Sequence, residues 1–299
     1  MTAATATASP PYRELTLLLL LATLWGASYT LIKFGIETIP PITLIAARTL
    51  IAGLLLLAVL RMRGIALPMD RGTWGKFFIQ ACLNSALPFT LIAWAELSVD
   101  AGLAGILNSL TPVMTVLLTL AWSRHEALSG TKLLGVALGL GGVCLIVGVQ
   151  ALQGIGDQLW GQLAVVLATA CYAGAAIFGK NFKGLDPIAP AAGSLICGAI
   201  ILIPLSLIID RPWTLTPSNQ SLTALLILAV FSTAGAFTLY FRLIHTLGSV
   251  GTTAQGYLRT PIAVGIGALF LGESLTSTAW IGLVCVILGV MAITWPRKS

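Results

Sequence analysis

The stretch GYLRTPIAVGIGALFLGES, residues 256–274, has the apolar character of a membrane span, but it contains Arg259 and, two positions later, Pro261. A guanidinium group in the middle of a membrane helix costs at least about 2.5–3.5 kcal/mol. Proline removes a backbone donor and bends a helix. A charge beside a helix break therefore indicates a span that faces the interior of a helix bundle or a watery cavity rather than lipid.

The composition of the whole chain is that of an integral membrane protein. Its 299 residues are 57% hydrophobic and 9% charged, and the mean hydropathy is +0.97. Since a soluble domain carries roughly 25% charged residues, there are too few charges here to cover a water-facing surface. The five cysteines lie singly in apolar runs, and we interpret them as small hydrophobes. We expect an all-α membrane protein with no cofactor and no metal site.

Ten apolar segments are long enough to cross a bilayer, which requires about 20 residues each. Twelve of the sixteen Lys and Arg residues fall on one side of these segments, Lys33 and Arg211 fall on the other, and Arg48 and Arg259 lie within spans. Because basic residues accumulate on the cytoplasmic side, both termini are predicted to be cytoplasmic, with residues 1–13 as a tail. This bias explains the net charge of +6 without a nucleic-acid partner. The predicted spans are 14–36, 41–61, 73–96, 100–123, 130–149, 159–181, 187–209, 220–244, 249–271 and 277–295.

The two halves of the chain resemble each other in an ordered way, with offsets of 146 to 149 residues. Each half contains five predicted spans, an odd number, so the second half must enter the membrane from the opposite side. The predicted fold is therefore two inverted five-helix repeats, 14–149 and 159–295, which is the plan of secondary transporters that bind substrate between the repeats. The clearest matches are FTL at 89–91 with FTL at 237–239, LTP at 110–112 with RTP at 259–261, and Glu126 with Glu273, each followed by two glycines at the same spacing.

These features resemble the drug/metabolite transporter superfamily and, within it, the ten-helix EamA-type exporters. The overall pattern is most similar to the YddG-like amino-acid exporters, which implies export of neutral and aromatic amino acids by a bacterial protein. The sequence departs from this pattern where Arg124 and His125 precede Glu126, because Leu-Gly precedes Glu273 in the second half. The resemblance is carried by Trp25-Gly26, Lys33, Arg48, Thr111-Pro112, Thr260-Pro261 and the two Glu…Gly…Gly segments.

Polar and aromatic side chains near span centres are the candidates for a substrate pathway, since lipid penalises amides and pockets combine apolar walls with a few polar groups. Arg259 and Arg48 either contact a substrate carboxylate, or form part of a gate, or cap carbonyls freed at helix breaks, and these interpretations stay open. Pro88, Pro112 and Pro261 mark helix breaks that line or gate the pathway. The remaining candidates are Trp25, Tyr29, Asn84, Ser85, Asn108, Tyr172, Tyr240, Gln255 and Tyr257.

The sequence thus predicts a multi-pass inner-membrane transporter that exports small amphipathic metabolites, neutral and aromatic amino acids foremost, by alternating access. All ten acidic residues fall at span ends or in loops, which favours a uniporter, while proton exchange through peripheral groups stays open. One alternative is a multidrug or other metabolite exporter with proton exchange, and another is an intramembrane enzyme, although the spans lack converging titratable groups. The expected partners are a small-molecule substrate and the lipid bilayer, and a homodimer is left open.

Overall fold

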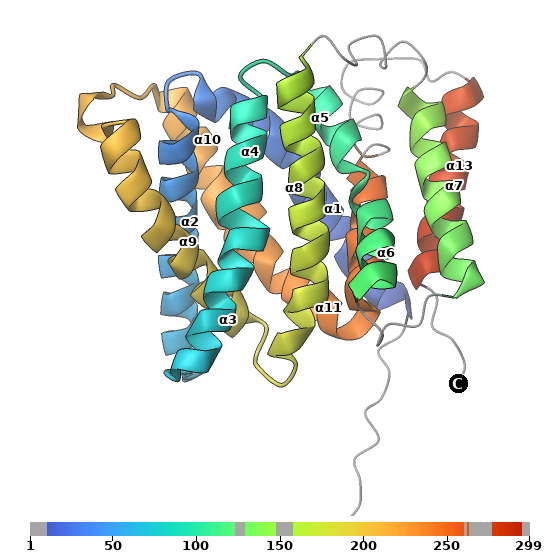
Figure 1. Ribbon diagram of the computed structural model, residues 1–299, viewed down its shortest axis with the longest axis horizontal. Coiled ribbons are helices and arrows are strands. Elements are labelled where there is room, and N and C mark those ends of the chain that lie inside the picture. Colours follow the sequence, from blue (N-terminus) through green and yellow to red (C-terminus); the bar gives the residue numbers. More distant parts are fainter. Residues whose placement is uncertain (1–10, 123–128, 148–157, 260–261, 263–276, 295–299) are drawn as a thin grey trace, which may run out of the picture.

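The computed structural model describes residues 11–122, 129–147, 158–259, 262 and 277–294, and the regular structure within these residues is all helical. The helices run side by side through one bundle (Figure 1). Two π-helical stretches, η1 (Cys82–Ala86) and η5 (Val230–Gly235), and two 3-10 turns, η3 (Gly179–Phe182) and η4 (Pro212–Thr214), connect or interrupt the α-helices. The α-helices are α1 (Pro11–Ile36), α2 (Pro41–Met62), α3 (Arg71–Ala81), α4 (Leu87–Ala95), α5 (Ala101–Asn108), α6 (Thr111–Trp122), α7 (Gly130–Val147), α8 (Leu159–Phe178), α9 (Ile188–Ile209), α10 (Asn219–Ala229), α11 (Ala236–Thr253) and α13 (Ser277–Thr294).

Among the described residues, seven helical stretches are long and apolar enough to cross a membrane. Two shorter apolar helices, Gly130–Leu145 and Trp280–Thr294, lie within the fifth and tenth predicted spans. About half of the ninth predicted span, 249–271, lies outside the described residues, so the count of ten spans stays a prediction. The seven long stretches are Tyr12–Ile36, Pro41–Met62, Arg71–Ala95, Leu103–Ala121, Leu159–Phe182, Ile188–Ile209 and Asn219–Thr253.

Several helices begin at residues that satisfy or remove the unpaired backbone N–H groups of a first turn. Pro41 occupies the first turn of α2, where its missing N–H needs no partner. Asp70 caps α3 by accepting a hydrogen bond from the Thr73 amide at 2.8 Å. Ser218 caps α10 in the same way by accepting from the Ser221 amide at 3.1 Å. These caps fix where the apolar segments enter the bundle.

The third and eighth predicted spans are each interrupted by a π-helical stretch at a matching position. Val230, the first residue of η5, follows Cys82, the first residue of η1, by 148 residues, which is also the offset between the two FTL segments. A π-helical turn displaces carbonyls from the usual α-helical ladder. Just before η5, the carbonyl of Leu228 in α10 accepts a hydrogen bond from Thr233 Oγ1 of η5 at 2.7 Å. Pro88 follows η1 directly, in the first turn of α4.

The fourth predicted span is broken beside Pro112. Helix α5 ends at Asn108, and α6 begins at Thr111, with Pro112 as its second residue. Thr111 Oγ1 bridges the break by donating to the main-chain oxygen of Asn108 at 2.7 Å. The corresponding break predicted at Pro261 lies outside the described residues.

The helices of the first half pack closely against helices of the second half. Helix α2 lies along α9, α7 along α13, and α4 along α8, while α1 packs against α10 and α11. Figure 1 shows α7 and α13 standing together at one side of the bundle. A Cβ atom on Gly142 of α7 would lie 2.6 Å from the carbonyl oxygen of Gly282 on α13, so glycine permits this approach. The glycine-rich faces of these two helices therefore pack within the chain.

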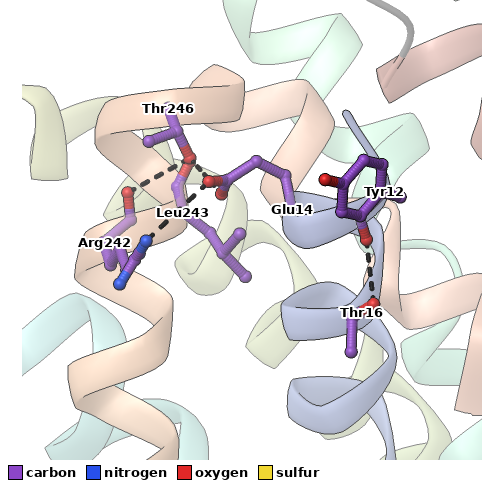
Figure 2. Close-up of polar contacts among 6 residues, drawn as sticks. All are labelled: Tyr12, Glu14, Thr16, Arg242, Leu243 and Thr246. Atoms are coloured by element: carbon purple, nitrogen blue, oxygen red, sulfur yellow. Dashed lines mark hydrogen bonds and ion pairs between the residues drawn. The ribbon is translucent and has the colours of Figure 1, made fainter. Parts of the chain in front are cut away.

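One end of the bundle is held by polar contacts between α1 and α11 (Figure 2). Glu14, which is buried near the start of α1, accepts a hydrogen bond from Thr246 Oγ1 at 2.8 Å, and Arg242 Nη2 lies 4.0 Å from its other oxygen. Just beyond Thr246, Gly248 adopts φ 74° and ψ −178°, which interrupts the helical geometry of α11. This backbone conformation is open to glycine and turns the chain between the eighth span and the next helical segment.

Candidate functional site

A cavity lies in the middle of the bundle, among spans of both halves. Its walls combine aromatic rings, amides, hydroxyls and two guanidinium groups, which is the mixture expected of a site for a small amphipathic molecule. The lining residues are Trp25, Ser28, Tyr29, Ile32, Arg48, Asn84, Phe89, Ile92, Asn108, Thr111, Tyr172, Tyr240, Thr253, Gln255 and Arg259.

Arg48 reaches the cavity from α2 and is bound to the π-helical stretch of the opposite half. Its Nε donates to Thr233 Oγ1 at 2.6 Å, and its Nη2 donates to the Ser232 carbonyl at 3.3 Å. The guanidinium carbon lies 4.0 Å from the centre of the Phe89 ring, where a cation–π contact adds to the attraction. Arg48 thus supplies donors to the helix that η5 distorts, which is the capping role.

Arg259 belongs instead to a side-chain network at the other wall of the cavity. Its Nε donates to Gln255 Oε1 at 2.9 Å, and its Nη1 donates to the Tyr29 hydroxyl at 2.7 Å. The same hydroxyl accepts a hydrogen bond from the Asn108 amide, and Thr111 Oγ1 donates to Asn108 Oδ1 at 2.9 Å. The network joins α1, the break between α5 and α6, and the helical residues 255–259. It holds the guanidinium at the cavity by side-chain contacts.

Aromatic rings form the apolar part of the cavity wall. The Trp25 ring lies 5.6 Å from that of Tyr240, and the Phe89 ring lies 6.3 Å from that of Tyr172. The Trp25 indole N–H donates to the Ser232 carbonyl at 3.1 Å, so two cavity residues, Trp25 and Arg48, bind the same carbonyl of η5. Ring pairs at these separations stack in tilted arrangements and offer flat surfaces to a substrate.

The charge of the cavity wall is positive. Among its described lining residues the two cationic groups are Arg48 and Arg259, and Asp, Glu and His are absent. Because charges interact more strongly away from bulk water, a buried cationic wall favours a negatively charged group on the bound molecule. A carboxylate is the smallest biological group that matches the donor geometry of a guanidinium.

The structure brings together nine of the residues predicted from the sequence, and it places others elsewhere. Ser85 lies outside the cavity lining, because its hydroxyl donates back to the Ala81 carbonyl of its own helix at 3.0 Å. Tyr257 also lies outside it: the ring packs on Gly139 of α7 and the hydroxyl donates to the Val136 carbonyl at 3.2 Å. The nine residues that line the cavity are Trp25, Tyr29, Arg48, Asn84, Asn108, Tyr172, Tyr240, Gln255 and Arg259.

Several lining residues were missed by the sequence reasoning, chiefly Phe89, Ile92 and Ile32, because an apolar side chain gives no contrast within an apolar span. The spacing of residues along a helix could have identified one of these apolar lining residues from the sequence. Ile92 lies three residues after Phe89 and therefore shares its helix face. Pro88 and Pro112 shape the helices next to the cavity without lining it.

A cationic, aromatic cavity enclosed by interrupted membrane helices belongs to the class of membrane transporters for small solutes. The model of the EamA-like transporter family matches the chain twice, over residues 13–148 and 159–295. The chain therefore belongs to the EamA-like transporter family, within the drug/metabolite transporter superfamily. It is a multi-pass membrane transporter and not an enzyme.

Relatives in the same family cover nearly the whole chain. The uncharacterized inner membrane transporter YedA of Escherichia coli (strain K12) is 27% identical over 275 residues, which cover 91% of this chain and 87% of YedA. The uncharacterized transporter YoaV of Bacillus subtilis (strain 168) is 24% identical over 91% of this chain and 93% of YoaV. Protein PecM of Dickeya dadantii (strain 3937) is 24% identical over 90% of this chain and 88% of PecM.

One solved crystal structure shares the fold. It superposes with a TM-score of 0.73 at 18% sequence identity, and the match covers 97% of this chain and 100% of the other.

Proposed function

We propose that the protein exports small amphipathic metabolites that carry a carboxylate, neutral and aromatic amino acids foremost, across the inner membrane. The observation that carries this proposal is the cavity wall, in which Arg48 and Arg259 face a space lined by Trp25, Phe89 and Tyr240. The guanidinium groups suit a carboxylate, and the rings suit an apolar or aromatic side chain. This substrate class is also the one implied by the resemblance to the YddG-like exporters.

The architecture that we propose is ten spans in two inverted five-helix repeats, 14–149 and 159–295, with residues 1–13 and the C-terminus in the cytoplasm. The matching positions of η1 and η5 support the repeat. The packing of α2 on α9 and of α7 on α13 supports it too, because each pair joins equivalent helices of the two halves. In this arrangement the cavity lies between the repeats, and rocking of one repeat against the other would open it alternately to each side.

The proposed location is the inner membrane of a bacterial cell. The name of YedA, an inner membrane transporter, supports this location, and the apolar spans fit it. A homodimer remains a hypothesis. The glycine faces of α7 and α13 pack against each other within one chain, so they do not support a dimer interface.

Export of bulky cationic drugs is the alternative within the same class. A cationic substrate would require a carboxylate in the cavity, and the described lining residues contribute two arginines instead. The cavity charge therefore favours carboxylates over cations.

Transport by purified protein in liposomes tests the proposal. We expect accumulation of radiolabelled neutral and aromatic amino acids above protein-free liposomes, with little movement of cationic ones. The panel is run with and without a pH gradient, because a uniporter moves substrate equally well in both conditions. In cells, expression of the protein should increase release of the same amino acids into the medium. If no amino acid in the panel enters the liposomes faster than it enters protein-free liposomes, the amino-acid proposal is refuted.

A further inference from the structure

Glu96, at the end of α4, is a buried carboxyl group to which the proposed transport cycle gives no role. It directly follows the span Arg71–Ala95 and is 0% exposed. Both of its carboxyl oxygens are buried without a hydrogen-bond partner among the residues that the structure describes. An ionised carboxylate without hydrogen bonds is very costly to bury, and such a group takes up a proton instead.

Glu96 lies next to the cavity, one helical turn beyond its wall. Ile92 lines the cavity, and Glu96 follows four residues later on the same face of the helix. On α1, Tyr29 lines the cavity, and Lys33 follows it by the same spacing. The Lys33 ammonium donates to the main-chain oxygen of Glu96 at 2.6 Å. Lys33 and Glu96 thus form a layer between the cavity and the end of the bundle that the charge pattern assigns to the outside.

Charged groups in the cavity wall and in the layer beside it act on Glu96. Lys33 on α1 and Arg48 on α2 both act electrostatically on Glu96, and Glu96 in turn acts on Tyr29, the partner of Arg259. The outer end of α8, which packs on α4, presents the neutral residues Gly161 and Gln162, and Asp100 is exposed at the start of α5.

Burial raises the pKa of the Glu96 carboxyl to about 8, although Lys33 and Arg48 oppose the shift. For an acid with a raised pKa, the buried conformation is favoured while the group holds its proton, below about pH 8. That preference declines as the pH rises above the ordinary carboxyl pKa of 4.5 and is lost by about pH 8.

We propose that Glu96 is a proton-binding site that controls how strongly the cavity binds the substrate carboxylate. The proposal rests on the proposed function. An ionised Glu96 adds a negative charge beside the cavity, which weakens the attraction of the cationic cavity wall for the substrate carboxylate, whereas a protonated Glu96 adds no charge. Substrate binding and proton binding at Glu96 are then mutually favourable, and by linkage each increases the affinity for the other. Substrate affinity on this account depends on pH, which the uniport that the sequence favours does not by itself require.

A direct test titrates the carboxyl group itself, without any substrate. Infrared difference spectra of the purified full-length protein in lipid nanodiscs should show a buried protonated carboxyl that ionises with a midpoint near pH 8. Glu96→Gln should lack this signal, and Asp100→Asn, which removes an exposed carboxylate nearby, should keep it. The proposal is overturned if Glu96→Gln retains the signal. If Glu96→Gln does not fold, Glu96→Asp should show the same signal at a shifted midpoint, and an unshifted signal would overturn the proposal.

A second measurement follows amino-acid affinity against pH. The wild-type affinity should fall by roughly tenfold for each pH unit above the midpoint if binding requires the proton, and the affinity of Glu96→Gln should stay constant across the same range. Equal pH profiles for the two proteins would contradict the proposal. The two proposals fail separately: a carboxyl titration without amino-acid transport contradicts only the proposed substrate, and amino-acid transport without the titration contradicts only the role of Glu96.

Discussion

Arg48 and Arg259 carry the same charge to the same cavity, but their hydrogen bonds go to different kinds of partner. Arg48 donates to Thr233 and to the Ser232 carbonyl, where η5 interrupts a helix. Arg259 donates to the side chains of Gln255 and Tyr29. One of the two Arg48 bonds goes to the main chain at a helix interruption, whereas both Arg259 bonds go to side chains, which can rearrange. We therefore propose a mainly structural role for Arg48 and a substrate-binding role for Arg259.

The largest expected effect is loss of transport in Arg259→Ala. Removing one partner of a buried charged pair typically costs at least about 2 kcal/mol, so amino-acid affinity should fall roughly thirtyfold or more. The amount of folded protein should stay near the wild-type level, as measured by gel filtration in detergent. Lys76→Ala is the matched control, because it removes an exposed positive charge from α3. If Arg259→Ala mainly prevents folding, this residue shares the role assigned to Arg48.

For Arg48→Ala, we expect the main effect to be on stability. The truncation removes the donor to Thr233, opens space beside Phe89 and should lower the unfolding free energy by about 1–3 kcal/mol. Thermal unfolding of the purified protein measures this as a lower melting temperature, again with Lys76→Ala as control. The remaining folded protein should keep its order of preference among amino acids. An unchanged melting temperature with a changed preference would reverse the assignment.

A smaller effect is expected from Tyr29→Phe, which sharpens the comparison at the Arg259 network. The variant removes the hydroxyl that accepts from both Arg259 and Asn108, while the ring stays in place. Two hydrogen bonds are lost, but only the one from Arg259 positions the guanidinium; at about 0.5–1.5 kcal/mol for that bond, affinity should fall roughly two- to tenfold. Tyr12→Phe is the matched control, since it removes the hydroxyl of an exposed tyrosine that does not line the cavity. Equal losses in both variants would argue against a special role for the network.

Most spans could be predicted because membrane-spanning hydropathy depends on composition over about 20 residues and not on packing. Arg259, Asn108 and Gln255 could be predicted as cavity residues because each is a polar group in an apolar span. Tyr257 was misplaced for the opposite reason. An aromatic residue suits either a cavity or a packing face, and only the close approach of Gly139 shows that it packs on α7.

The features that escaped prediction depend on contacts between helices. The residues of η1 and η5 carry no composition that distinguishes them from the α-helical turns on either side. Glu96 lies at the end of a predicted span, where a carboxylate is normally hydrated. Its burial results from the neighbouring helices that cover the end of α4.

The most direct test of the account compares two solutes that differ only in a carboxylate: an aromatic amino acid and the amine that lacks its carboxyl group. Their transport rates are measured in liposomes with the wild-type protein and with Arg259→Gln, which keeps a polar side chain but removes the charge. We predict that the wild type prefers the amino acid strongly and that Arg259→Gln loses most of this preference. An unchanged preference in Arg259→Gln would contradict the claim that Arg259 recognises the substrate carboxylate.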